Sequence, residues 1–199
     1  MRIAYLHGFN SGPMSIKGRA LADAIAALPV DARPEYFLPK LHHEPRKAIR
    51  ALSEWIESQR DVPTLVGSSL GGFYAVHLAE RHGTRAVLIN PALRPWESLA
   101  ACLGPQRNPY TNESYELKRE HLAQLEAFRV PRISRPERYL LLVQSGDELL
   151  DYREAVVFLA GASQFVQGGG DHAYRNFAAE IPSVLRFAGV DLPAGSERR

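Results

Sequence analysis

Short apolar runs alternate with longer amphipathic segments along most of the chain. The apolar runs predict strands at residues 2–7, 35–38, 63–67, 86–89, 138–144 and 164–167. The amphipathic segments predict helices at residues 15–28, 45–60 and 174–188, with others after residues 69 and 144. Strands that alternate with helices of this length are typical of βαβ units with right-handed crossovers. We therefore expect an α/β fold: a compact, mostly parallel, doubly wound sheet covered by helices on both faces.

The segment 91–136 breaks this alternation. It contains six prolines, a polar stretch at residues 106–112 and one amphipathic helix predicted for residues 113–128. Ligands of such sheets bind beyond the carboxyl ends of the strands, so an excursion that leaves the strand 86–89 is expected to lie over a binding site. We predict a small helical cap or lid. The alternative is a helix that packs on the edge of the sheet and contacts no ligand.

Composition favours one soluble domain. The chain has 199 residues, of which 45% are hydrophobic, so we assign residues 1–190 to one domain and residues 191–199 to a flexible tail. The net charge is +2 without a basic stripe, which argues against nucleic-acid binding. Cys102 is the only cysteine, and no apolar run is long enough for a signal peptide or a membrane span. We expect a cytoplasmic protein without a membrane partner, and the oligomeric state stays open.

The sequence Gly67-Ser-Ser-Leu-Gly-Gly72 lies between a predicted strand and a predicted helix. This is the context of the G-x-S-x-G nucleophile elbow, in which a serine sits on a sharp strand-to-helix turn. Glycines are needed on both sides because the cramped backbone leaves no room for side chains. Ser69 is therefore the candidate nucleophile, and hydrolysis is the leading hypothesis.

A serine nucleophile needs a histidine base and a carboxylate that orients the histidine. In hydrolases with this elbow the acid and then the histidine follow the serine in the chain. His172 follows three glycines after the last predicted strand, and Asp147 follows a glycine at the end of the strand before it. Asp151 is predicted to cap the next helix. Asp147 is the preferred acid, with Asp151 and Glu148 as alternatives.

The other histidines are expected to be structural. His42 and His43 are adjacent in a loop, a spacing that we do not expect to place two imidazoles on one metal ion. The glycines at 168–170 are not followed by a phosphate-binding motif, so no nucleotide site is expected. We predict neither a metal nor a cofactor.

Two backbone N–H groups are candidates for binding the oxyanion of an acyl-transfer intermediate. One belongs to Leu70, directly after the candidate nucleophile. The other belongs to Phe9, in the loop after the first strand.

Several stretches together resemble the small bacterial α/β-hydrolase esterases of the YqiA type. They are residues 7–11, 67–72, 89–92, 108–111, 144–152 and 169–172. The resemblance implies hydrolysis of carboxylic esters or thioesters with short or medium acyl groups, without a metal and through Ser69, Asp147 and His172. The third glycine before Asp171 departs from the expected pattern. Compared with larger α/β hydrolases, we expect this chain to lack the first antiparallel strands.

These observations lead to three functional hypotheses. The first is a serine esterase that acts on a small-molecule ester through an acyl-enzyme. The second is an acyl-CoA thioesterase, in which Arg94 or Arg107 near the cap meets the phosphates. The third is a non-catalytic homologue that binds a ligand. Asn10, Arg94, Arg107 and Tyr110 are the predicted substrate contacts.

Overall fold

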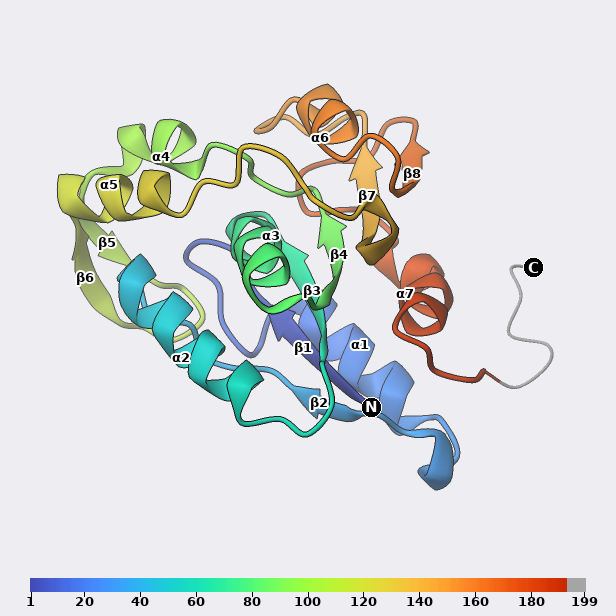
Figure 1. Cartoon of the computed structure of the whole chain (residues 1–199). Helices are drawn as coiled ribbons and strands as arrows, with labels where there is room; N and C mark the ends of the chain where they lie inside the picture. The colour runs from blue at the N-terminus through green and yellow to red at the C-terminus, as the bar shows by residue number, and fades with distance from the viewer. Residues whose placement is uncertain (193–199) are drawn as a thin grey trace.

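A computed structural model describes residues 1–192, so most of the predicted tail, residues 193–199, lies outside the described part. Six parallel strands form the main sheet in the order β2-β1-β3-β4-β7-β8 (Figure 1). The strands are β1 (Arg2–Leu6), β2 (Glu35–Phe37), β3 (Thr64–Ser68), β4 (Arg85–Ile89), β7 (Tyr139–Gln144) and β8 (Ser163–Gln167). The prediction of a parallel α/β sheet is confirmed.

Helices cover both faces of the sheet, as predicted. One face packs against α1 (Ile16–Ala26) and α7 (Ile181–Phe187). The other face packs against α2 (Pro45–Glu57), α3 (Leu70–His82) and α6 (Tyr152–Phe158). Successive residues of β1 enter opposite clusters: Ile3 lies in the α1/α7 cluster and Ala4 in the α2/α3/α6 cluster. This two-residue alternation explains why the strand is apolar at nearly every position.

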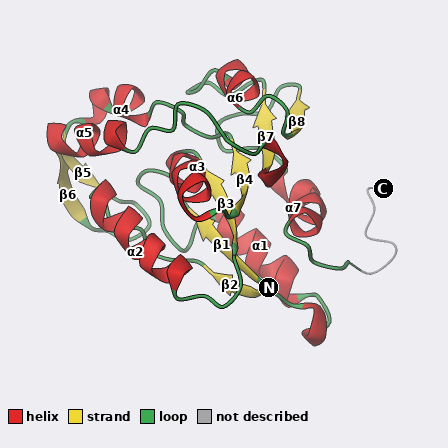
Figure 2. Ribbon diagram, viewed as in Figure 1, coloured by secondary structure: helices red, strands yellow, loops and turns green. Residues whose placement is uncertain are grey.

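The segment 91–136 contains more than the single predicted helix. It forms α4 (Pro95–Ser98), a 3-10 turn (Ala100–Cys102), a hairpin of β5 (Gly104–Arg107) and β6 (Ser114–Leu117), α5 (Arg119–Ala127) and a second 3-10 turn (Pro136–Arg138). Figure 2 shows the hairpin as a pair of strands apart from the main sheet. The predicted helix start at residue 113 is wrong, because residues 114–117 pair with β5 instead. Helix α5 packs against α2 and α4.

The C-terminal helix is also shorter than predicted. Tyr174 and Asn176 have φ values of 61° and 59°, which an α-helix does not accommodate. A 3-10 turn (Phe177–Glu180) follows, and α7 begins only at Ile181. A further 3-10 turn spans Val30–Ala32. None of the helices in residues 1–192 combines the length and the apolar character needed to span a membrane.

The turn from β3 to α3 packs unusually close to β1. A Cβ atom on Gly71 would lie 1.9 Å from the Leu6 carbonyl oxygen. A Cβ atom on Gly67 would lie 2.3 Å from the Gly71 carbonyl oxygen. Both contacts are far below van der Waals distance and involve backbone, which cannot rotate away. The glycines of the predicted elbow are therefore required by close approach.

We predict that Gly71→Ala destabilises the fold by at least about 2 kcal/mol, because the new methyl group must push β1 and α3 apart. Urea denaturation measures the loss. Gly168→Ala is the matched control, since a Cβ there meets nothing within 4 Å, and its stability should stay within about 1 kcal/mol of wild type. A Gly71→Ala protein as stable as this control would contradict the packing argument.

His7 connects the end of β1 to the loop after β2. It is 5% exposed, and its Nε2 atom accepts a hydrogen bond from the Leu41 N–H at 3.1 Å. Its Nδ1 atom lies 3.0 Å from the Gly8 carbonyl oxygen, which fits a neutral ring with the proton on Nδ1. Burial lowers the pKa of His7, and the Gly8 contact opposes this shift more weakly.

A lowered pKa means that the unfolded chain binds a proton at His7 more readily than the folded chain does. Folding stability should therefore fall as the pH drops below the ordinary histidine pKa of about 6.5. We predict that the melting temperature of His7→Gln falls less than that of wild type when the pH is lowered from 7.5 to 5.5. Because the other histidines are common to both proteins, the difference reports His7. Equal losses would show that His7 is not held neutral by the fold.

Candidate active site

Three polar side chains meet at the carboxyl edge of the sheet. The Ser69 Oγ atom lies 3.0 Å from the His172 Nε2 atom. The His172 Nδ1 atom lies 2.9 Å from the Asp147 Oδ2 atom. Ser69 follows β3, Asp147 follows β7 and His172 follows β8. Because the strands are parallel, their carboxyl ends lie at the same edge, and this brings together residues that are 103 positions apart in the chain.

Ser69 occupies a strained backbone conformation, with φ at 53° and ψ at −119°. Backbone hydrogen bonds hold it there. Its N–H donates to the Ile89 carbonyl at 3.1 Å, and its carbonyl accepts from the N–H groups of Gly72 at 2.9 Å and Ala92 at 3.1 Å. The strand β4 and the chain that leaves it thus fix the serine at the sharp turn, as a nucleophile elbow requires.

Asp147 is the carboxylate beside the imidazole. Its side chain is 2% exposed, and its Oδ1 atom accepts the N–H groups of Leu149 and Leu150, each at 2.9 Å. These bonds fix the carboxylate, and both of its oxygens lie within hydrogen-bond distance of His172 Nδ1, at 3.0 Å for Oδ1 and 2.9 Å for Oδ2. Asp151 instead accepts the Arg153 N–H at 3.0 Å and caps α6, as predicted. The structure therefore places Asp147, and not Asp151, against the imidazole.

Glu148, the third acidic candidate, contacts the histidine through the backbone. Its Oε2 atom accepts the His172 N–H at 2.9 Å. This hydrogen bond is the largest of the contributions that lower the pKa of Glu148. The glutamate therefore holds the main chain at His172 and leaves the imidazole to Asp147.

The N–H groups of Leu70 and Phe9 flank the serine. Leu70 is the first residue of α3, where the N–H groups have no partner within the helix. The loop of Phe9 passes so close that a Cβ atom on Gly8 would lie 3.3 Å from the Ser69 Cβ atom. Within residues 1–192, neither N–H donates a hydrogen bond to a protein acceptor. Phe9, Leu70 and Ser69 all line the same cavity.

A cavity of about 760 Å³ opens beside Ser69 and His172. This volume is in the range of pockets that bind small molecules. Its walls come from α1, from the chain that leaves β4, from the loop before α6 and from the loop after His172. They include Ile16, Ala20, Pro95, Leu99, Leu149 and Phe177. Most of these side chains are apolar, so the cavity suits a ligand with an apolar portion.

Of the four predicted substrate contacts, Tyr110 lines this cavity. Asn10 instead fixes the β5–β6 hairpin to the loop after β1: its amide donates to Gln106 at 3.0 Å and accepts from the Tyr115 hydroxyl at 2.7 Å. Of the predicted cap, residues 91–136, only one part lines the cavity. The chain through α4 and the following turn contributes to the cavity wall, whereas α5 packs beside α2.

The two predicted arginines lie outside the cavity wall. Arg94 pairs with Glu154 and, at 3.2 Å, with Glu97. Arg107 donates to Asn112 at 3.3 Å within the hairpin. The cationic residues that do line the cavity are Lys17 and Arg175. Neither cation was predicted to contact a ligand, because no sequence motif distinguishes them from surface cations.

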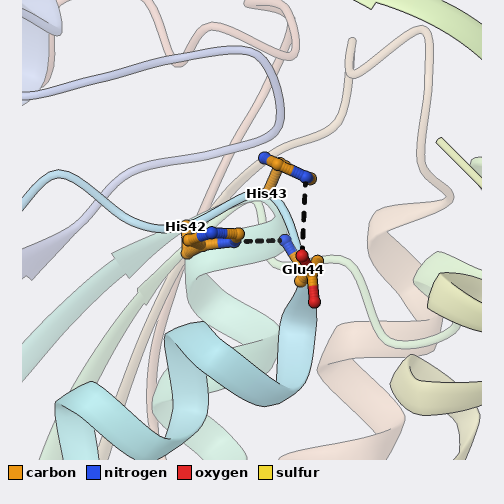
Figure 3. Close-up of side chains that lie close together, drawn as sticks. All are labelled: His42, His43 and Glu44. Carbon is orange, nitrogen blue, oxygen red and sulfur yellow. Dashed lines mark hydrogen bonds and ion pairs between the residues drawn. The ribbon is translucent and has the colours of Figure 1, made fainter. Parts of the chain in front are cut away.

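A possible metal-ligating group lies outside this cavity, at the start of α2. Figure 3 shows His42, His43 and Glu44, whose ligand atoms lie within 4.8 Å of one another. The expectation that adjacent histidines could not approach one ion is therefore too strict. However, the His42 Nδ1 atom accepts the Glu44 N–H at 2.9 Å, and the Lys47 ammonium lies 2.7 Å from the Glu44 carboxylate. These contacts compete with a metal ion for two of the three ligands.

Known structures share this fold over almost their full length. Mouse alpha/beta hydrolase domain-containing protein 10 has 15% identity and a TM-score of 0.69, with 93% of this chain and 89% of that chain covered. The monoacylglycerol lipase of Paleococcus ferrophilus has 16% identity and a TM-score of 0.69, with 96% and 95% covered. Est1E of Butyrivibrio proteoclasticus has 14% identity and a TM-score of 0.66, with 94% and 88% covered. At these identities the similarity establishes the α/β-hydrolase fold.

A family model matches residues 2–189, almost the whole of the chain. Its description is Uncharacterised protein family (UPF0227), the family of the YqiA-type proteins that the sequence resembles. The expected resemblance is confirmed. The chain is therefore a member of the UPF0227 family with an α/β-hydrolase fold.

Proposed function

We propose that this protein is a serine hydrolase that cleaves carboxylic esters with short or medium acyl chains. The observation that carries the proposal is the continuous hydrogen-bonded chain from Ser69 through His172 to Asp147, with separations of 3.0 and 2.9 Å. The first distance is within the reach that proton transfer from serine to imidazole requires, and the second is within hydrogen-bond distance of the carboxylate.

In the acylation step, the Ser69 oxygen attacks the ester carbonyl while His172 Nε2 removes the hydroxyl proton. Asp147 keeps the other imidazole proton on Nδ1 and stabilises the imidazolium that forms. The tetrahedral intermediate then collapses: the bond to the alcohol oxygen breaks, and His172 returns its proton to that oxygen. The products of this step are the free alcohol and an acyl group on Ser69.

The negative oxygen of the intermediate needs donors that are already in place. The N–H groups of Phe9 and Leu70 fill this role in the proposal, because both flank Ser69 without a protein acceptor in the described part of the chain. Removing one such donor typically costs about 3 to 4 kcal/mol of transition-state stabilisation.

Water activated by His172 then attacks the acyl group and releases the acid.

The cavity supports an ester with an apolar acyl or alcohol part. Its mostly apolar wall provides a place for such a group next to Ser69. The acyl-CoA alternative loses its predicted phosphate contacts, since Arg94 and Arg107 form pairs elsewhere on the fold. We therefore retain the ester as the proposed substrate class.

Replacement of the nucleophile tests the proposal. We expect Ser69→Ala to lower kcat/KM for p-nitrophenyl butyrate by about 10⁴-fold or more, because among residues 1–192 no other hydroxyl is hydrogen-bonded to the His172 ring. Ser134→Ala, at an exposed serine that precedes the amino end of β7, should keep the wild-type rate. Turnover in folded Ser69→Ala equal to that of the control would refute the assignment.

The two candidate acids give a matched pair of isosteric variants. Asp147→Asn should lower kcat by about 10³- to 10⁴-fold, since an amide cannot stabilise the imidazolium or hold its tautomer. Asp151→Asn should change kcat by less than about threefold, because asparagine also caps helices. Steady-state kinetics with p-nitrophenyl butyrate measure both. The reverse order of effects would assign the acid to Asp151.

A further inference from the structure

The loop that carries His172, residues 168–176, contains neither a strand nor a helix, so its backbone groups lack the hydrogen bonds of regular secondary structure. Its backbone groups are instead satisfied mainly by side chains from other elements. Gln144 Oε1 accepts the N–H groups of Asp171 at 3.2 Å and Arg175 at 2.8 Å, and Gln144 Nε2 donates to the Arg175 carbonyl at 2.9 Å. Lys17 donates to the Ala173 carbonyl at 2.7 Å. The position of the imidazole therefore depends on side chains outside the loop.

Asn90, like Glu148, contacts the backbone of His172 itself. Its Nδ2 atom donates to the carbonyls of Asp171 at 3.0 Å and His172 at 3.1 Å. Its Oδ1 atom accepts the Gln144 N–H at 3.1 Å. Asn90 is 2% exposed, so water does not compete for these bonds. One buried amide thus holds the histidine loop and the end of β7 together.

The neighbours of Asn90 in the chain hold the serine. The carbonyl of Ile89 accepts the Ser69 N–H, and the N–H of Ala92 donates to the Ser69 carbonyl. Asn90 itself has φ at 40°, a conformation that asparagine adopts more readily than most residues. This turn directs the side chain across β7 toward His172. The turn after β4 therefore contacts Ser69 through its backbone and the histidine loop through its side chain.

We propose that Asn90 is a positioning residue that sets the distance between Ser69 Oγ and His172 Nε2. It touches neither the substrate nor the reacting atoms. It acts by fixing the backbone of His172 relative to the turn that fixes Ser69. The inference rests on the proposed function of Ser69 and His172, and a shift of about 1 Å between such groups can cost about 100-fold in rate.

Two substitutions test this role without straining the turn. Asn90→Asp is isosteric and suits the positive φ, but it places a carboxylate oxygen against two carbonyl oxygens. Asn90→Gly suits the same φ and removes all three hydrogen bonds. The control is Asn112→Asp, at an exposed asparagine with φ at 58° in the β5–β6 hairpin.

We expect both Asn90 variants to lower kcat for p-nitrophenyl butyrate by about 10- to 100-fold, with KM within about threefold of wild type. Activity is expressed per folded molecule, from circular dichroism and active-site titration at a temperature well below the melting point. The control should match wild type. Wild-type kcat in the Asn90 variants, or a loss that matches only the unfolded fraction, would overturn the proposal.

A second measurement does not depend on turnover. The imidazole Nδ1–H proton of His172, hydrogen-bonded to Asp147, should give a downfield proton signal in NMR spectra of wild type and of Asn112→Asp. We expect it to broaden or shift in both Asn90 variants, because the ring is no longer held against the carboxylate. An unchanged signal would overturn the positioning role. If wild type gives the signal but hydrolyses no ester, the proposed function is wrong. The positioning role of Asn90 is then judged from the signal alone, by comparing wild type with the two Asn90 variants.

Discussion

The backbone conformation of Ser69 is the constraint on which the site depends. A non-glycine residue at φ 53° is held there only because surrounding elements over-determine it. Gly67 and Gly71 allow β3, α3 and β1 to approach, and the chain after β4 bonds to both sides of the serine peptide. The turn then directs the hydroxyl to the carboxyl edge of the sheet. Without this geometry the Ser69 hydroxyl would not lie against the imidazole of His172.

The sheet topology determines which residues can meet that hydroxyl. In a parallel sheet every strand delivers its following loop to the same edge, so the loops after β3, β7 and β8 converge although they are distant in sequence. In the strand order, β4 and β7 lie between β3, which precedes Ser69, and β8, which precedes His172. Two side chains at the ends of these intervening strands bridge the gap: Asn90, directly after β4, and Gln144, the last residue of β7. The positions of Asn90 and Gln144 between the serine turn and the histidine loop therefore follow from the strand order.

Local patterns were sufficient to predict the main features. Apolar runs located the six strands of the main sheet. The order of Gly-x-Ser-x-Gly, Asp147 and His172 predicted three side chains that the structure brings into hydrogen-bond contact. These signals are local. A strand that is buried on both faces is apolar at nearly every position, and the elbow is marked by glycines close to the serine. The cap of α6 by Asp151 was also predictable, because capping depends on the next few residues only.

Other features depend on contacts between distant segments and could not be predicted. The β5–β6 hairpin replaced the start of a predicted helix because residues 114–117 find partners in residues 104–107. Arg94 and Arg107 looked like free cations, yet Glu154 and Asn112 engage them. Asn90 stood in a stretch shared with the family, but its role depends on a loop more than 80 residues away.

The most direct test of the account is the structure of the protein after reaction with an ester-like phosphonate. If Ser69 is the nucleophile, we expect one covalent adduct, on Ser69 Oγ, with the phosphoryl oxygen about 2.7 to 3.1 Å from the N–H groups of Phe9 and Leu70 and with His172 still against Asp147. An adduct on another residue, or a phosphoryl oxygen turned away from these two N–H groups, would contradict it.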